Sequence, residues 1–210
     1  NVRRFNLAQL RPWEVSFVDL KELPLDQFHG LKYAVILVDF KTLTIDCELI
    51  KDKVSTAWAV KTLLNRRAVQ LLPYQCTIYY DGDRSNNKIS EVALSMNCRS
   101  EPTIPYRQSL NMAELAIRIV MNAARKLCLH AKMHPTYLGL AVCCAAYNHN
   151  RIASAARGGK SPFELVTGKQ PDISHLRPFG AMCWSVKSEA KRKDSVRAKV
   201  KESARFQQPH

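Results

Sequence analysis

The chain has 210 residues, 46% of them hydrophobic, and its 32 Lys and Arg outnumber its 18 Asp and Glu to give a net charge of +14. This composition excludes a disordered chain, and no apolar run is long enough to span a bilayer. The positive charge favours a polyanion as partner, usually a nucleic acid, although residues 187–205 contribute eight Lys and Arg against three Asp and Glu.

The N-terminus and the cysteines bear on the setting of the chain. Residues 1–12 are basic and irregular and do not form a secretory signal, so we expect a lead-in from a missing upstream segment. The seven cysteines form no C-x-x-C pair and show no zinc-finger spacing with histidine. Reduced thiols, as in the cytosol or nucleus, are therefore expected, in a fragment of a longer protein.

Three strands are predicted in the first part of the chain, at residues 13–20, 31–40 and 42–50. The first alternates, with Val15, Phe17 and Trp13 on one face, and the second is an apolar run typical of a buried strand. The third is expected to pair antiparallel with the second. Asp19 and Asp39 lie near strand ends, where an acid is unexpected unless it reaches solvent or a site.

Residues 53–72 have a helical period, with an apolar face that includes Val54 and Trp58, and Pro73 stops this helix. Asp81 directly follows the next strand. The elements after the helix are a strand, a helix with a loop and another short strand, at residues 75–80, 85–100 and 103–104.

An amphipathic helix is predicted from Asn111 onward. Its apolar face recurs at three- and four-residue steps and consists of Ala113, Ala116, Val120, Ala124 and Leu127. Its polar face carries Glu114, Arg118, Asn122 and Arg125. Glu114 has two interpretations. It completes a capping box with Asn111 and pairs with Arg118, or it is a metal-binding carboxylate facing a site built by the upstream strands.

Asp19, Asp81 and Glu114 come from three different predicted elements. One acid at a strand end is more often a turn residue than a metal ligand, but three in this order are less easily explained that way. A two-metal phosphoryl-transfer site needs carboxylates from different elements that converge on ions about 4 Å apart. Oxygen ligands suit Mg²⁺, so the pattern is compatible with a magnesium site.

The order of elements and acids resembles the RNase H-like fold of retroviral and retrotransposon integrases. These proteins carry a D,D-35-E pattern, and here 32 residues lie between Asp81 and Glu114. The local motifs are most similar to the copia-type retrotransposon branch. Val18-Asp19-Leu20 resembles its H-x-D-L motif, and residues 33–40 resemble its Y-F-L-x-F-I-D-D-Y strand. Residues 105–114 resemble P-Y-T-P-Q-Q-N-G-V-A-E-R, with one residue fewer.

The downstream motifs are the most specific part of the resemblance, which covers roughly residues 11–186. Residues 159–171 read GKSPFELVTGKQP and resemble G-K-T-P-Y-E-L-W-T-G-K-K-P, and residues 174–180 read SHLRPFG and resemble S-H-L-R-V-F-G-C. The domains expected are a lead-in, an RNase H-like catalytic core, a post-core segment and a basic tail or linker, at residues 1–12, 13–150, 151–186 and 187–210.

The resemblance implies an α/β protein with a mixed five-stranded sheet flanked by helices. It implies a DNA-integrating enzyme whose Asp19, Asp81 and Glu114 bind Mg²⁺ or Mn²⁺ for 3′-end processing and strand transfer. Further copies of the chain and DNA are the implied partners, without a membrane or a small-molecule substrate, in the nucleus or in a cytoplasmic element particle. The arginines expected to hold phosphates, or else to form a solvated helix face, are Arg107, Arg118 and Arg125.

Several residues depart from the family pattern. Gly82-Asp83-Arg84 replaces the usual Asn-Gly-Gly, which makes Asp83 a rival of Asp81, and the glycine before the Glu motif is lost. An inactive, nucleic-acid-binding domain of the same fold is therefore a second hypothesis. A nuclease that cuts but does not join DNA is a third, and the downstream motifs argue against it.

Overall fold

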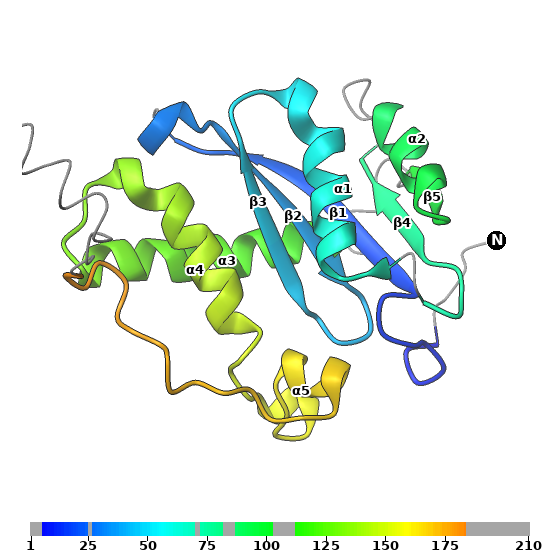
Figure 1. The fold of residues 1–210 in the computed structure, drawn as a ribbon. Coiled ribbons are helices and arrows are strands. Elements are labelled where there is room, and N and C mark those ends of the chain that lie inside the picture. Colours follow the sequence, from blue (N-terminus) through cyan, green and yellow to red (C-terminus); the bar gives the residue numbers. More distant parts are fainter. Residues whose placement is uncertain (1–5, 25–26, 70–71, 82–86, 103–111, 184–210) are drawn as a thin grey trace, which may run out of the picture. The chain divides into compact units, whose positions relative to one another are not determined.

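The computed structural model describes residues 6–24, 27–69, 72–81, 87–102 and 112–183. The chain divides into two units, residues 1–180 and 181–210. The first unit contains all of the strands and helices described below (Figure 1). Within the described part of the chain, no helix is long and apolar enough to cross a membrane.

A five-stranded mixed sheet forms the centre of the first unit, with the strand order β3-β2-β1-β4-β5. Its strands are β1 (Val15–Glu22), β2 (Tyr33–Asp39), β3 (Ile45–Ile50), β4 (Thr77–Tyr80) and β5 (Arg99–Pro102). β1 to β3 form an antiparallel meander, whereas β4 runs parallel to both β1 and β5. The predicted α/β class and five-stranded mixed sheet are thus confirmed.

Helices cover both faces of this sheet (Figure 1). They are α1 (Thr56–Arg66), α2 (Asn87–Ser95), α3 (Met112–His130) and α4 (Leu138–His149). The short helix α5 (Pro162–Thr167) follows α4 in the chain. Short 3-10 turns lie at Phe28–Gly30, Lys53–Ser55, Pro135–Tyr137 and Ala155–Arg157.

Two hydrophobic clusters follow from the alternation of side chains along the strands. The cluster under α3 and α4 includes Ile36 and Val38, and the cluster under α1 and α2 includes Val35 and Leu37. Because β2 is buried on both of its faces, its sequence is a continuous apolar run and not an alternating one. The apolar face of α3 packs against the sheet as the sequence predicts. Ala113 and the apolar residues that follow it at three- and four-residue steps belong to the first cluster.

The boundaries of the first helix differ from the prediction. α1 is shorter than residues 53–72, because Ala68 adopts a left-handed conformation (φ 49°) just beyond Arg66. Val54 precedes the helix and is 77% exposed, and Trp58 is 58% exposed, so neither belongs to the buried face. That face is formed by Thr56, Ala59, Val60, Leu63 and Leu64.

Two strand predictions also change. Trp13 precedes β1 and packs in the cluster under α1 and α2, on the opposite side from Phe17, so its predicted face was wrong. The last strand was predicted at residues 103–104, which lie outside the described residues. The structure has β5 at Arg99–Pro102, because Asn97 takes a left-handed conformation (φ 55°) after α2 and lets the chain extend beside β4.

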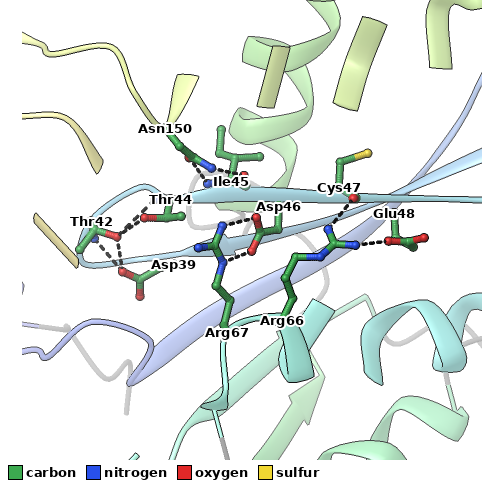
Figure 2. A network of polar contacts seen from close by, with 10 residues as sticks. All are labelled: Asp39, Thr42, Thr44, Ile45, Asp46, Cys47, Glu48, Arg66, Arg67 and Asn150. Carbon is green, nitrogen blue, oxygen red and sulfur yellow. Dashed lines mark hydrogen bonds and ion pairs between the residues drawn. The ribbon is translucent and has the colours of Figure 1, made fainter. Parts of the chain in front are cut away.

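A buried amide side chain, that of Asn150, connects the edge strand β3 to α4. Asn150, at the C-cap of α4, accepts a hydrogen bond from Ile45 N and donates one to Ile45 O, both at 2.8 Å (Figure 2). The side chain thereby satisfies two backbone groups at the open edge of the sheet, which otherwise lack a neighbouring strand.

Replacing Asn150 by Asp should test this connection, because the shape is kept while the donor to Ile45 O becomes an acceptor. We expect the free energy of unfolding to fall by roughly 3 kcal/mol in urea denaturation. Asn148→Asp is the control, since Asn148 donates only to the sulfur of Cys144, and its cost should stay below about 1 kcal/mol. Equal losses in the two variants would contradict this role of Asn150.

Two neighbouring arginines pair β3 with the end of α1 (Figure 2). Arg67 makes a bidentate ion pair with Asp46, whose side chain is 7% exposed. Arg66 pairs with Glu48 at 2.6 Å, and this pair is more open, with the Arg66 side chain 47% exposed.

Truncation of these two arginines should therefore have unequal effects. Arg67→Ala leaves the Asp46 carboxylate buried without its partner, and we expect a loss of about 3 kcal/mol in the free energy of unfolding. Arg66→Ala removes a solvent-screened pair and should cost less than about 1 kcal/mol. Chemical denaturation of both variants measures the difference, and a larger loss for Arg66→Ala would refute this interpretation.

Candidate active site

Asp19 and Asp81 meet where the pairing of β1 with β4 ends. The last parallel pair of this ladder joins Val18 to Tyr80, so the next residue of each strand is one of the two acids. The prediction put Asp19 at a strand end, but β1 continues to Glu22 along β2, and Asp19 lies inside it. Asp19 is half-buried, and its Oδ1 accepts a hydrogen bond from Leu20 N at 2.7 Å.

Asp81 is exposed and directly follows β4. The preceding residue is anchored, because the Tyr80 hydroxyl shares a 2.8 Å hydrogen bond with Ser90 Oγ on α2. The end of β4 is thus held from both sides, by β1 and by α2. This fixes where the backbone delivers Asp81.

Glu114 lies in the first turn of α3 and is exposed. Its position is set by its neighbours on the helix, because Ala113 and Ala116 are buried against the sheet. α3 packs on both β1 and β2, and β1 is the strand that carries Asp19. The proposed capping partner, Asn111, lies outside the described residues.

The charges of two of the predicted acids act on the third, Asp19. The pKa of Asp19 is raised above its ordinary value, first by burial, and then by the negative charges of Asp81 and Glu114. The Leu20 N–H and the Lys21 ammonium oppose this effect. The structure therefore brings the three sequence-predicted acids into one electrostatic neighbourhood at the end of the β1–β4 ladder.

The proximity of these acids does not by itself make a metal-binding site. Across the ranges that the structure describes, no three His, Cys, Asp or Glu side chains lie in an arrangement that would hold a metal ion. The assignment of Asp19, Asp81 and Glu114 to metal binding remains a prediction. The rival Asp83 lies outside the described residues, as does Arg107.

The structure separates a structural acid from the candidate site. Asp39, at the end of β2, is fully buried and accepts hydrogen bonds from Trp13 N at 2.8 Å and from Thr42 N at 2.9 Å (Figure 2 shows the Thr42 contacts). Its pKa is raised by burial against the opposing effect of these bonds. Asp39 therefore organises the β2–β3 turn and does not face the other acids.

Two predicted basic residues lie on the exposed side of α3, the helix that carries Glu114. Arg118 and Arg125 are exposed, and Arg125 Nη1 donates to Asn122 Oδ1 at 3.3 Å. Lys21 was not predicted from the sequence as a charge near the candidate acids. It lies two residues after Asp19 on the same face of β1, so the two-residue period of a strand was the signal that could have found it.

The comparisons with solved structures define the class of fold. The catalytic core domain of HTLV-2 integrase, solved with magnesium in a trimeric form, matches 74% of this chain and 97% of that chain, with a TM-score of 0.56 and 18% identity. A simian T-cell lymphotropic virus intasome in complex with the PP2A regulatory subunit B56 gamma matches 80% of this chain and 59% of that chain, with a TM-score of 0.60 and 18% identity. The chain has the RNase H-like fold of an integrase catalytic core.

Proteins with similar sequences point to a more specific group than the fold does. The chain is 25% identical over 175 residues to the retrovirus-related Pol polyprotein from transposon RE1 of Arabidopsis thaliana. It is 29% identical over 105 residues to that from transposon TNT 1-94 of Nicotiana tabacum, and 25% over 185 residues to that from RE2 of A. thaliana. These matches cover 83%, 50% and 85% of this chain.

The chain spans only 8–12% of the length of these polyproteins. No family model matches it. The chain thus has the fold of integrase catalytic cores and is similar to one stretch of plant retrotransposon Pol polyproteins, as the sequence motifs indicated.

The different environments of Asp19 and Asp39 predict opposite effects on stability. Asp39→Asn removes an acceptor oxygen from a buried network, and we expect a loss of roughly 2 kcal/mol in the free energy of unfolding. Asp19→Asn removes a carboxylate whose charge is disfavoured by burial and by two nearby acids, so stability should be unchanged or raised. Thermal and urea unfolding without divalent cations test this, and a strongly destabilised Asp19→Asn variant would show that Asp19 is a structural residue.

Proposed function

We propose that this chain is the catalytic core of a retrotransposon integrase, which processes DNA 3′ ends and joins them to target DNA. The observation that carries the proposal is that the charges of Asp81, after β4, and Glu114, in the first turn of α3, both act on Asp19 in β1. The integrase-core fold and the similarity to Pol polyproteins support it.

The donor set fits Mg²⁺ or Mn²⁺ by its chemistry. All three groups are carboxylates, and hard divalent cations prefer oxygen ligands. The charges of Asp81 and Glu114 raise the pKa of Asp19, a repulsion that a bound cation would relieve. When bound, such ions lower the pKa of a water molecule or of a 3′-hydroxyl, and they neutralise charge on the reacting phosphate.

The protein residues supply position and charge. Asp19 is held within a paired strand, and Glu114 is held by the buried alanines beside it on α3. Arg118 and Arg125 lie on the exposed side of the same helix and would contact DNA phosphates near the acids. This arrangement orients a DNA end without a covalent protein–DNA intermediate.

The solved relatives suggest the partners. One integrase core was solved in a trimeric form and another in an intasome, and we extend both to this chain as a proposal of self-association on DNA. Action on chromosomal DNA would place the protein in the nucleus or in an element particle that delivers it there.

A second candidate function is DNA binding without catalysis. It is favoured by the lack of a three-ligand metal arrangement in the described part of the chain and by the altered sequence around residues 82–84 and 109–112. Metal-dependent joining is the activity that separates the two proposals.

A strand-transfer assay with labelled DNA ends in Mg²⁺ or Mn²⁺ tests the catalytic proposal. We expect joining that disappears in EDTA and falls about 100-fold or more in Asp19→Asn and Glu114→Gln, because each removes a cation-binding carboxylate. Glu91→Gln, an exposed acid on α2, is the matched control and should retain activity.

Metal binding and DNA binding give independent readouts. Mg²⁺ should raise the melting temperature of the wild type but not of Asp19→Asn. If Glu114 acts only as a cap, Glu114→Gln should keep its activity and lose at most about 1 kcal/mol of stability. DNA binding without joining in either metal would favour the non-catalytic domain.

A further inference from the structure

A pair of thiols lies between the edge strand and α4, away from the three acids in the sequence. Cys47 on β3 and Cys143 on α4 have their Sγ atoms 3.6 Å apart and share a hydrogen bond. Cys47 is buried, and Cys143 is half-buried. All seven cysteines are free thiols in the structure, so Cys47 and Cys143 are not joined by a disulfide there.

A cavity of about 380 Å³ reaches both thiols. Its wall includes Arg66 and Arg67 from the end of α1 and Arg151 after α4. Figure 2 shows Arg66 donating to the carbonyl oxygen of Cys47, at 3.3 Å from Nη1. A small solute therefore has a path to the thiol pair that does not require unfolding.

The surroundings make Cys143 the more acidic thiol of the two. The hydrogen bond with Cys47 lowers the pKa of Cys143, and the Arg66 charge adds to this, against the opposing effects of burial and of Glu48. Once Cys143 has ionised, the Cys47 S–H donates to its thiolate. The same interaction and burial raise the pKa of Cys47, so Cys47 keeps its proton while Cys143 ionises.

We propose that Cys47 and Cys143 form a redox-active pair that a hydroperoxide converts reversibly into a disulfide. The Cys143 thiolate attacks one oxygen of the peroxide, the O–O bond breaks, and hydroxide or alkoxide leaves and takes a proton from solvent. The product is a sulfenic acid on Cys143. The Cys47 sulfur then attacks the Cys143 sulfur, its proton is lost, and the sulfenic oxygen leaves as water.

The geometry needs only a small adjustment for the second step. A disulfide bond is about 2.05 Å long, so the two sulfurs must approach by roughly 1.5 Å, within the reach of side-chain rotation. The bond would link residues 96 positions apart in the sequence. A cross-link over so long a loop should stabilise the fold, and we expect the melting temperature to rise by roughly 10 °C.

Other cysteines of the chain provide contrasts. Cys76 and Cys98 interact with each other as well, but they are only 1% and 4% exposed and do not line this cavity. Cys144 is adjacent to Cys143 on α4 and receives its hydrogen bond from Asn148. Cys183 is exposed and would cross-link copies of the chain, so Cys183→Ser is the background for all variants.

The test treats this background protein with hydrogen peroxide, blocks the remaining thiols with an alkylating agent, and maps the cysteines by peptide mass spectrometry. We expect one intramolecular Cys47–Cys143 link, a loss of two hydrogens in mass, a higher melting temperature, and full reversal by dithiothreitol. Cys47→Ser should stop at oxidised Cys143 without a link, and Cys143→Ser should remain unlinked. Cys144→Ser should form the link as the parent does.

Several outcomes would overturn the proposal. These are recovery of Cys47 and Cys143 as alkylated free thiols, sulfinic acid on Cys143 without a link in the parent, or preferential linkage of Cys76 to Cys98. Cys47→Ala and Cys143→Ala serve as a second pair of variants. Circular dichroism before the peroxide treatment shows whether each variant folds, so a folding defect is not mistaken for a lost link. The readouts do not involve DNA, so they are independent of the integrase proposal.

Discussion

The parallel pairing of β1 with β4 sets the geometry of the sheet and of the candidate site. It joins the antiparallel meander to the second half of the sheet, and its last pair, Val18 with Tyr80, fixes where the two strands part. Because both strands run in the same direction, the residues that follow this pair emerge at one edge. Two acids that are more than sixty residues apart therefore become neighbours.

The candidate site is then completed by helix packing. α3 buries small residues, Ala113 and Ala116, which let its first turn lie close to the sheet and carry Glu114 with it. Asp19 lies in an unfavourable electrostatic environment, since burial and two like charges disfavour its ionised form. A site that gathers like charges in this way is typical of one that binds a cation.

The edge strand β3 shows how the same fold is closed on its other side. Among the described strands β3 lies at the edge of the sheet, and side chains make polar contacts there, with Asn150 bonding its backbone and Arg67 pairing with Asp46. Cys47 and Cys143 meet between the same two elements. The edge is thus the place where α1, α4 and the sheet are held together by polar groups.

Sequence patterns predicted most of the strands, the first three helices and the candidate acids, but not α4 or α5. Alternation and helical periods identified β1 to β3, α1 and α3, and the motifs pointed to an integrase core, because local pattern and local spacing are written in consecutive residues. The errors lay at boundaries, such as the end of α1 and the position of β5, where single left-handed residues decide, and in the faces predicted for Trp13, Val54 and Trp58.

Which polar groups come into contact depends on how the strands and helices pack. Asp19 and Asp39 look alike in sequence, but one faces other acids and the other is enclosed in a turn. The Cys47–Cys143 pair also had no sequence signal. Such contacts join residues far apart in the chain, and they depend on strand register and helix packing, which no local pattern encodes.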